Sequence, residues 1–334
     1  MKKKILFITT GGTIASSDSG DGLKPTVHAA TMLEELGYTE SYDFVISEPF
    51  QIDSSNMRPS DWNVLMESIR THSEGCDGVV VLHGTDTMAY TASALSYMLL
   101  DFPLPVVITG SQKPIHAEGT DAIRNITCAI EAAATAPAPL VMIAFANHVM
   151  LGCHTSKVSA DRLAAFHTLY GKDIGYFRKG QMHWYKKRID KLLSARRSMP
   201  CCTITGKAFL LKLVPGISSD ICDFFHGGSY QALVIEGFGS GGIPNRKTEF
   251  LNKLQKLVDE GMIVVCKTQC FYGKTDMSIY EVGRLAMDAG VISMSNITTE
   301  ALVTKLMWLL SLDFSTEEIK EALATNYAGE LVVI

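Results

Sequence analysis

The feature that most constrains the fold is a repeated alternation of short apolar runs with longer amphipathic segments. The runs 5–10, Gly78–Leu82 and Val106–Thr109 have strand length, and each leads into a loop rich in glycine, serine and threonine. Between them, residues 88–100 and 121–134 have the apolar spacing and length of helices that pack on a sheet. Strands that alternate with helices predict an α/β fold with a mostly parallel sheet.

The pattern lapses once along the 334 residues and then resumes. Basic residues and Pro200 interrupt it after residue 188, and it restarts with apolar runs near 209, 232 and 262. Because a chain of this length is typical of two domains, we predict a larger N-terminal catalytic domain and a smaller C-terminal one, both α/β with mostly parallel sheets. The predicted bounds are 1–188 for the first domain, 189–207 for a linker and 208–334 for the second. Ser60 is expected to cap a helix through Trp62 and Ile69, and the closing segments 299–310 and 316–323 are expected to be helical.

Composition and charge exclude several classes of protein. The net charge of −5 argues against a nucleic-acid partner, which would require concentrated lysine and arginine. The longest uncharged stretch is broken by Pro137, Pro139 and Asn147, and its solid apolar part, 140–146, is far shorter than the roughly 20 residues of a membrane helix. Eight cysteines without a regular framework favour reduced thiols in a cytoplasm. The close pairs, Cys201 with Cys202 and Cys266 with Cys270, have no second pair at zinc-ligand spacing, so we expect no metal site.

Three ready-made motifs are weak or absent. Residues 237–242 match the dinucleotide pattern of three glycines, but Pro244 follows at once and the next apolar run ends in Lys267 rather than an acidic ribose ligand. A phosphate-binding loop would need a lysine that is missing after Gly11-Gly12-Thr13, and no serine elbow is present. We therefore expect no cofactor, and a nicotinamide enzyme is a minor alternative.

What remains is hydroxyl chemistry at the carboxyl ends of the strands, where open α/β sheets bind ligands. Thr13 follows the first strand, where backbone N–H groups can face a developing oxyanion, and Thr85 stands beside the carboxylate of Asp86. A hydroxyl is a weak nucleophile that needs a base or a shared proton path. Each threonine alone is more commonly a local hydrogen-bond partner of its own turn.

Two motifs carry a family resemblance. Residues 9–15, Thr-Thr-Gly-Gly-Thr-Ile-Ala, together with 83–87, His-Gly-Thr-Asp-Thr, resemble the two signatures of the bacterial-type L-asparaginases. The resemblance extends through segments 53–57, 110–112 and 155–157, and later through 237–242 and 267–270, so it covers essentially the whole chain. The short N-terminus, the cysteines and the Asp-Ser-Ser loop are more similar to the cytoplasmic type than to the periplasmic type.

The resemblance implies a role for each matching residue. Thr13 would be the nucleophile that forms an acyl-enzyme with the side-chain amide of asparagine, and Thr85, Asp86 and Lys157 would handle protons or activate water. The small-molecule substrate would be bound by Asp53, Ser54, Ser55, Thr85, Asp86 and Ser111. No metal is implied, and family members are usually dimers or tetramers of identical chains.

Several alternatives stay open at this point. Many relatives have a tyrosine where Leu23 stands, so the activator of Thr13 is undetermined, and Gly20 and Gly22 suggest a lid. Lys157 is either a base, which requires its pKa to fall from about 10.4 to near neutrality, or a charged partner of Asp86. The other functional readings are an asparagine sensor without turnover, a glutaminase-asparaginase of mixed specificity, and the ammonia-supplying subunit of a tRNA-dependent amidotransferase, which usually carries an extra N-terminal domain.

Overall fold

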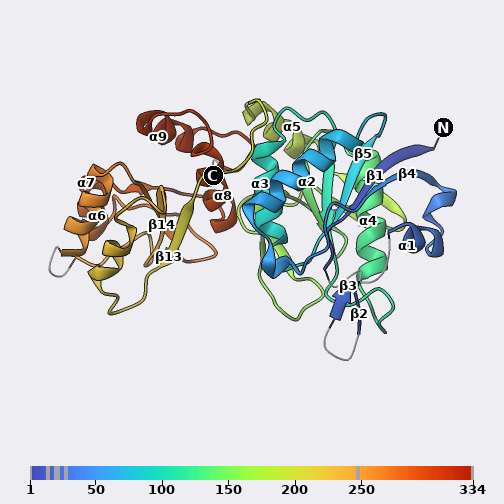
Figure 1. Ribbon diagram of the computed structural model, residues 1–334, viewed down its shortest axis with the longest axis horizontal. Coiled ribbons are helices and arrows are strands. Elements are labelled where there is room, and N and C mark those ends of the chain that lie inside the picture. The colour runs from blue at the N-terminus through green and yellow to red at the C-terminus, as the bar shows by residue number, and fades with distance from the viewer. Residues whose placement is uncertain (1, 13–15, 19–22, 26–28, 246–248, 332–334) are drawn as a thin grey trace. The chain divides into compact units, whose positions relative to one another are not determined.

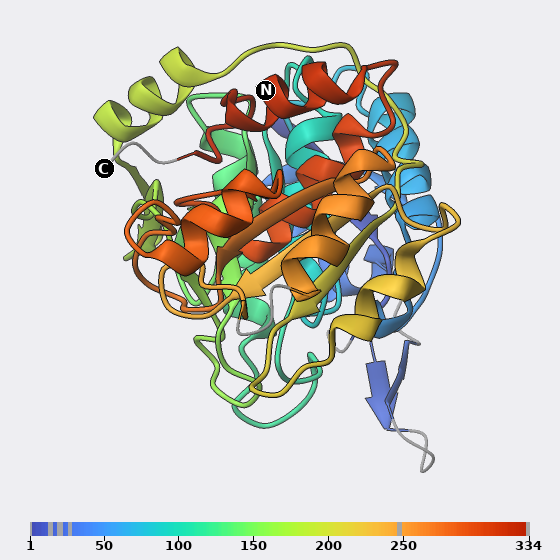
Figure 2. The ribbon, with the colours of Figure 1, turned by 90° about the vertical axis from the view of Figure 1, so that its left-hand side faces the viewer.

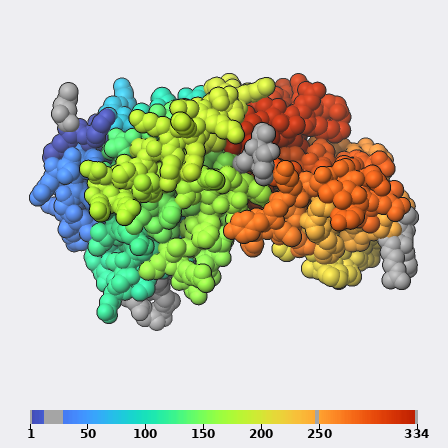
Figure 3. Space-filling view, turned by 180° about the vertical axis from the view of Figure 1, so that it is seen from behind, coloured from blue at the N-terminus to red at the C-terminus, as the bar shows by residue number. Residues whose placement is uncertain are grey.

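The computed structural model describes residues 2–12, 16–18, 23–25, 29–245 and 249–331. It divides the chain into two compact units, Met1–Cys201 and Cys202–Ile334. Each unit is folded from one continuous length of chain, as the blocks of colour on the surface show (Figure 3). Each contains a sheet with parallel strands and covering helices, so the predicted α/β class, with a larger N-terminal and a smaller C-terminal part, is confirmed.

The larger unit is built on an eight-stranded sheet of order β12-β11-β8-β7-β6-β5-β1-β4. Strands β4, β1, β5, β6 and β7 run parallel, whereas β8, β11 and β12 extend the sheet in antiparallel pairs. Strand β5 is buried at every residue, because a parallel sheet covered on both faces leaves no side for solvent. The bounds are β1 Lys3–Thr9, β4 Tyr42–Ser47, β5 Gly78–Leu82, β6 Val106–Thr109, β7 Val141–Phe145, β8 His148–Leu151, β11 Gly175–Arg178 and β12 Gln181–Trp184.

Helices α2 and α3 cover one face of this sheet and α4 covers the other (Figure 1). Two small hairpins complete the unit, β2 with β3 and β9 with β10. The bounds are α1 Ala29–Glu35, α2 Pro59–His72, α3 Met88–Met98, α4 Ala122–Thr135, α5 Lys186–Ala195, β2 Ser16–Asp18, β3 Leu23–Pro25, β9 Thr155–Lys157 and β10 Phe166–Thr168.

Two local expectations differ from the structure. Ser60 does not cap α2, because the helix already begins at Pro59, whose fixed φ suits the first helical position, and the carboxylate of Asp61 accepts from the backbone N–H of Arg58 at 2.7 Å. The first part of the segment predicted as a linker, 189–207, lies in α5, where Ile189 is buried. Most of the other residues of α5 are polar, so the sequence gives little sign that Ile189 is buried.

The smaller unit has a four-stranded parallel sheet of order β13-β14-β15-β16. Helices α6 and α7 lie on the face turned toward the viewer in Figure 2, and α8 contacts β13 and β14 from the opposite face (Figures 1 and 2). The bounds are β13 Ala208–Lys212, β14 Ala232–Gly237, β15 Ile263–Thr268, β16 Ile292–Ser293, α6 Glu249–Asp259, α7 Glu281–Asp288, α8 Thr299–Leu309 and α9 Thr316–Ala324.

A fully buried ion pair holds the end of the chain against α8. Lys305 Nζ lies 2.7 Å from Glu330 Oε1, and both side chains are 0% exposed. The same ammonium donates to the carbonyl oxygens of Leu323 and Thr325, and Glu330 accepts from backbone N–H groups, Tyr327 among them. Each charge is thus hydrogen-bonded from several sides, which is the condition under which a buried pair is tolerated.

We expect Lys305→Met to destabilise the smaller unit by about 3–5 kcal/mol, because it leaves the Glu330 carboxylate buried without its cation. The matched control is Lys320→Met, which removes an ammonium from the exposed pair with Glu317 and should cost about 1 kcal/mol or less. Urea denaturation followed by circular dichroism measures both. Equal losses in the two variants would show that Lys305 is not a structural cation.

Candidate active site

Four loops meet at the carboxyl edge of the larger sheet. They follow β1, β4, β5 and β6, which are adjacent and parallel, so their ends point the same way. The loops contain residues 10–12, 53–56, 83–87 and 110–112, and these include the predicted binding residues Asp53, Ser54, Ser55, Thr85, Asp86 and Ser111. This is the edge where ligands bind in open α/β sheets.

Glycines allow these loops to touch backbone to backbone. A Cβ added to Gly12, which has a φ of +86°, would lie 2.6 Å from the Cα of Gly84, and one added to Gly84 would lie 2.5 Å from Ser54 Oγ. A Cβ on Gly110 would lie 2.2 Å from the carbonyl oxygen of His83. Since real Cβ atoms do not approach so closely, any side chain at these positions would force the loops apart.

The predicted group Thr85, Asp86 and Lys157 is brought together in the structure. Lys157 Nζ, on β9, lies 2.7 Å from Asp86 Oδ1 and 2.9 Å from Thr85 Oγ1. The Lys157 side chain is 17% exposed and that of Asp86 is 59% exposed, so the pair faces solvent from the carboxylate side. These contacts correspond to the second alternative for Lys157, in which it pairs with Asp86 instead of acting as a base.

Ser54 joins its own loop to the loop of Thr85. Its Oγ accepts from the backbone N–H of Asp86 at 3.2 Å, and its carbonyl oxygen accepts from Thr87 Oγ1 at 2.8 Å. A hydroxyl that accepts one hydrogen bond still has a proton that it can donate. Ser54 can therefore both hold the loop and bind an anionic group.

The other predicted binding residues have local partners. Asp53 Oδ1 accepts from the backbone N–H of Ser55 at 2.8 Å, and hydrogen bonds from the side chain and then the backbone of Ser55 lower the pKa of the Asp53 carboxyl. Asp53 thus caps the turn Ser54–Asn56. Ser111 is buried and its hydroxyl donates to the carbonyl oxygen of Lys113, within its own loop.

Two predictions concern residues outside the described part of the chain. These are the expected nucleophile, Thr13, and the expected lid with Gly20 and Gly22. Leu23 begins β3, and the backbone register pairs it with Asp18 of β2. The structure therefore describes the surroundings of the expected nucleophile up to Gly12.

Sequence reasoning missed the role of Gln112. Its Oε1 accepts from Thr85 Oγ1 at 3.0 Å, and its Nε2 donates to the carbonyl oxygens of Ala160 and Arg162 at 3.1 and 3.4 Å. The residue is visible in the sequence only as part of a polar loop, because nothing there places it against a segment about fifty positions later.

A buried chain of hydrogen bonds holds the Thr85 loop against α2 and α3. Trp62 Nε1 donates to Thr91 Oγ1 at 3.0 Å, and Thr91 Oγ1 lies 2.9 Å from His83 Nε2. His83 Nδ1 lies 2.7 Å from the carbonyl oxygen of Gly84. Because that carbonyl only accepts, Nδ1 carries the proton and Nε2 accepts from Thr91. Complete burial lowers the pKa of His83 to about 4, so the imidazole is neutral at pH 7.

In the smaller unit, the glycine-rich segment 237–242 forms a closed turn. The backbone N–H groups of Gly241 and Gly242 donate to the carbonyl oxygen of Phe238, at 2.9 and 2.7 Å, and no helix begins directly after the glycines in the part that the structure describes. A dinucleotide site needs such N–H groups free at a helix start. The segment therefore lacks the local structure of that motif.

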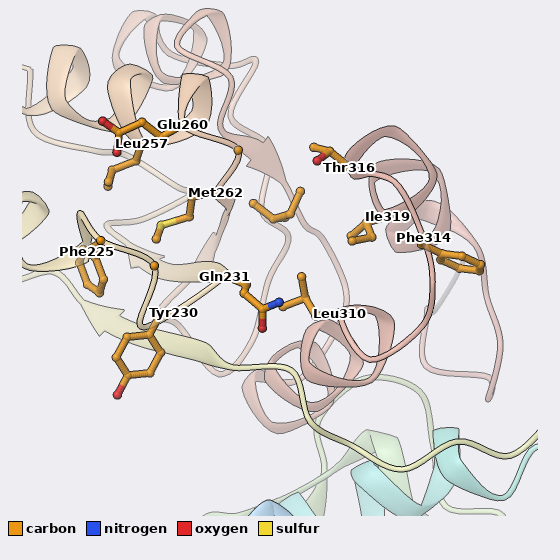
Figure 4. Close-up of a pocket in the computed structure, with 14 residues that line it drawn as sticks. Phe225, Tyr230, Gln231, Leu257, Glu260, Met262, Leu310, Phe314, Thr316 and Ile319 are labelled. Carbon is orange, nitrogen blue, oxygen red and sulfur yellow. The ribbon is translucent and has the colours of Figure 1, made fainter.

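A cavity of about 440 Å³ lies elsewhere in the smaller unit (Figure 4). Phe225, Leu257, Met262 and Ile319 give it an apolar wall, and Gln231 and Glu260 are among its polar lining residues. None of the site residues predicted from the sequence lines it. Among the described residues, no group of three or more histidine, cysteine, aspartate or glutamate side chains is placed to hold a metal ion.

Buried His83 generates a pH-dependent stability. The unfolded state binds this proton near pH 6.5 and the folded state only near pH 4, so stability falls as the pH is lowered through this window. We expect the wild type to lose up to about 3 kcal/mol more than His83→Gln between pH 6.5 and pH 4, at 1.36 kcal/mol for each pH unit.

Urea denaturation at each pH measures this difference, with His116→Gln, at an exposed histidine, as the matched control. If the His83→Gln variant keeps the full wild-type pH dependence, His83 is not neutral in the folded protein.

Known proteins resemble the chain over its whole length. The family model "Asparaginase, N-terminal" matches residues 4–190, and "Glutaminase/Asparaginase C-terminal domain" matches residues 207–323. L-asparaginase 1 of Escherichia coli K12 is 36% identical over 99% of both chains. The structure of the thermostable L-asparaginase of Thermococcus kodakarensis has a TM-score of 0.90 at 34% identity and covers 99% of this chain and 100% of that one.

A second kind of relative has a longer chain. One of the subunits of the glutamyl-tRNA(Gln) amidotransferase of Pyrococcus abyssi is 33% identical over 98% of this chain and 76% of its own length. Both family models, the two-unit fold and the full-length relatives agree, and the chain belongs to the asparaginase family of amidohydrolases, which act on linear amides.

Proposed function

We propose that this protein is an L-asparaginase that hydrolyses L-asparagine to L-aspartate and ammonia through a threonine nucleophile. The observation that carries the proposal is the cluster of Lys157, Asp86 and Thr85 at the carboxyl edge of the sheet, with the backbone of Gly12 in contact with Gly84. Gly12 precedes Thr13 in the chain and Gly84 precedes Thr85. This contact supports a site in which both threonines act on one substrate.

The proposed reaction has two steps. The Thr13 hydroxyl attacks the side-chain carboxamide carbon, the C–N bond breaks, and ammonia leaves with the proton from the hydroxyl, so that an ester to Thr13 remains. Water then attacks the ester carbon and releases aspartate, and its proton returns to Thr13. Backbone N–H groups near Gly12 would stabilise the oxyanion in both steps. The group of Thr85, Asp86 and Lys157 would guide the proton movements.

Recognition of the substrate requires partners for two opposite charges. Asp86 is half exposed and acidic, which suits the α-ammonium of a free amino acid. Ser54 has a hydroxyl proton to donate to the α-carboxylate, and Ser55 follows it on the exposed side of the same turn. Asp53 contributes by holding this turn.

The amidotransferase relatives share the amide chemistry, so ammonia release without tRNA is what distinguishes an asparaginase from an ammonia-supplying subunit. A sensor would bind asparagine without continuing heat of hydrolysis in calorimetry.

The cytoplasmic location and the homodimer or homotetramer stay predictions from the resemblance. None of the helices in the described part of the chain has the length and apolarity needed to span a bilayer.

We expect Thr13→Ala and Lys157→Met to lower the kcat for ammonia release from asparagine by several orders of magnitude, whereas Thr13→Ser should retain measurable turnover because it keeps a hydroxyl. A coupled ammonia assay measures the rates, and Lys172→Met, at an exposed lysine, is the control for loss of an ammonium. Near-full activity in Thr13→Ala would remove this residue from its role.

The preference for asparagine over glutamine should be moderate. The two substrates differ by one methylene, which a binding pocket distinguishes by about 1–3 kcal/mol, or roughly 10–200-fold in kcat/KM. Steady-state ammonia release as a function of each substrate concentration measures this ratio. A kcat/KM for glutamine equal to or above that for asparagine would contradict the assignment as an asparaginase.

A further inference from the structure

The hydroxyl of Thr85 has one proton, and the structure shows where it goes. Thr85 Oγ1 lies 2.9 Å from Lys157 Nζ and 3.0 Å from Gln112 Oε1. The orientation of the Gln112 amide follows from its other partners, because its second polar atom faces the carbonyl oxygens of Ala160 and Arg162, which accept only. That atom must be the NH₂ group, so the atom that faces Thr85 is the carbonyl oxygen.

The direction of each hydrogen bond then follows. An amide oxygen has no proton, so Thr85 must be the donor to Gln112. With its proton used, Thr85 can only accept from Lys157, and Lys157 donates both to Thr85 and to Asp86. Among the residues that the structure describes, no other donor contacts Thr85 Oγ1, so its second lone pair is left for the reacting group.

We propose that Gln112 is a positioning residue for the reaction: by taking up the proton of Thr85, it makes this hydroxyl an acceptor toward the reacting group. The hydroxyl of Thr85 then accepts a hydrogen bond from the attacking water. A relay in which Thr85 passes its proton to Lys157 would first have to break the bond to Gln112. This inference rests on the proposed function, because it assigns Gln112 to the same site.

The position of Gln112 is itself set by buried residues at the start of α4. Its backbone N–H donates to both carboxylate oxygens of Asp121 at 3.1 Å, and Asn125 Nδ2 donates to Asp121 Oδ2 at 3.0 Å and to the carbonyl oxygen of Gly110 at 2.9 Å. Asn125 Oδ1 accepts from the backbone N–H of Ala146 after β7. Asp121 and Asn125 are buried, so the loop that carries Gln112 is held by the interior of the larger unit.

Two substitutions of Gln112 separate its acceptor from its donors. Gln112→Glu keeps an oxygen acceptor toward Thr85 but loses the NH₂ group, and Gln112→Met loses both. Each variant lacks the N–H donors to Ala160 and Arg162, so the effect of losing these donors is common to the two. Gln112→Glu also places a carboxylate oxygen toward these carbonyls, so activity retained by this variant cannot be due to a better hold on that segment. Gln181→Met, at an exposed glutamine of β12, is the matched control.

We expect Gln112→Met to lower kcat for asparagine about ten- to hundredfold, as for the loss of one oriented hydrogen bond, with KM changed by less than about threefold. Gln112→Glu should keep kcat within about threefold of the wild type, and Gln181→Met should match the wild type. Steady-state ammonia release gives kcat and KM for each variant, and circular dichroism checks the fold.

The results that would contradict the role of Gln112 differ from those that would contradict the proposed function. If the wild type is active and Gln112→Glu is no better than Gln112→Met, or if Gln112→Met is as active as the wild type, the acceptor role of Gln112 is wrong while the proposed function stands. If the wild type itself releases no ammonia from asparagine, both the proposed function and this inference fall.

Discussion

The contact between the backbones of Gly12 and Gly84 is the constraint on which the site depends. It brings the loop after β1 to the loop after β5, and Gly84 in turn leaves room for the hydroxyl of Ser54. Without side chains at these positions, three loops converge within contact distance and bring their hydroxyl and carboxylate groups to one edge of the sheet. The rest of the larger unit positions these loops through a parallel sheet whose strand ends lie side by side.

The groups around this contact divide into a buried support and a half-exposed reactive set. Neutral His83, Thr91 and Trp62 form a hydrogen-bonded chain that ends on the carbonyl of Gly84, and complete burial keeps the imidazole uncharged. Lys157 and Asp86 carry opposite charges next to Thr85, where solvent reaches the carboxylate. A neutral support avoids the large cost of burying an unpaired charge below them.

Much of the fold is readable from the sequence because the signals are strong and local. Strands β1, β5 and β6 each contain an unbroken apolar run, and α3, α4, α8 and α9 fall within a few residues of the predicted segments. The antiparallel strands β8, β11 and β12 are four residues each, which is too short for a pattern such as the polar–apolar alternation of β12 to stand out in the sequence. Helices α6 and α7 were not predicted, although α6 has apolar residues at helical spacing, such as Phe250, Leu254 and Leu257.

The site is predictable only in part, for a physical reason. Motifs in the sequence predict Thr85, Asp86 and Lys157, and the structure brings them into contact. Gln112, however, is oriented by the carbonyl oxygens of Ala160 and Arg162, and a sequence does not show which backbone oxygens face a given amide. Likewise, Gly84 is one of many loop glycines until its distance to Gly12 is known.

The most direct test of the central claim is to find which atom carries the substrate during turnover. An asparagine analogue with a diazoketone in place of the side-chain amide alkylates the group that attacks it, and peptide mass spectrometry then locates the adduct. We expect a single modification, on the side-chain oxygen of Thr13. An adduct on Thr85 instead, or on no hydroxyl in this site, would contradict it.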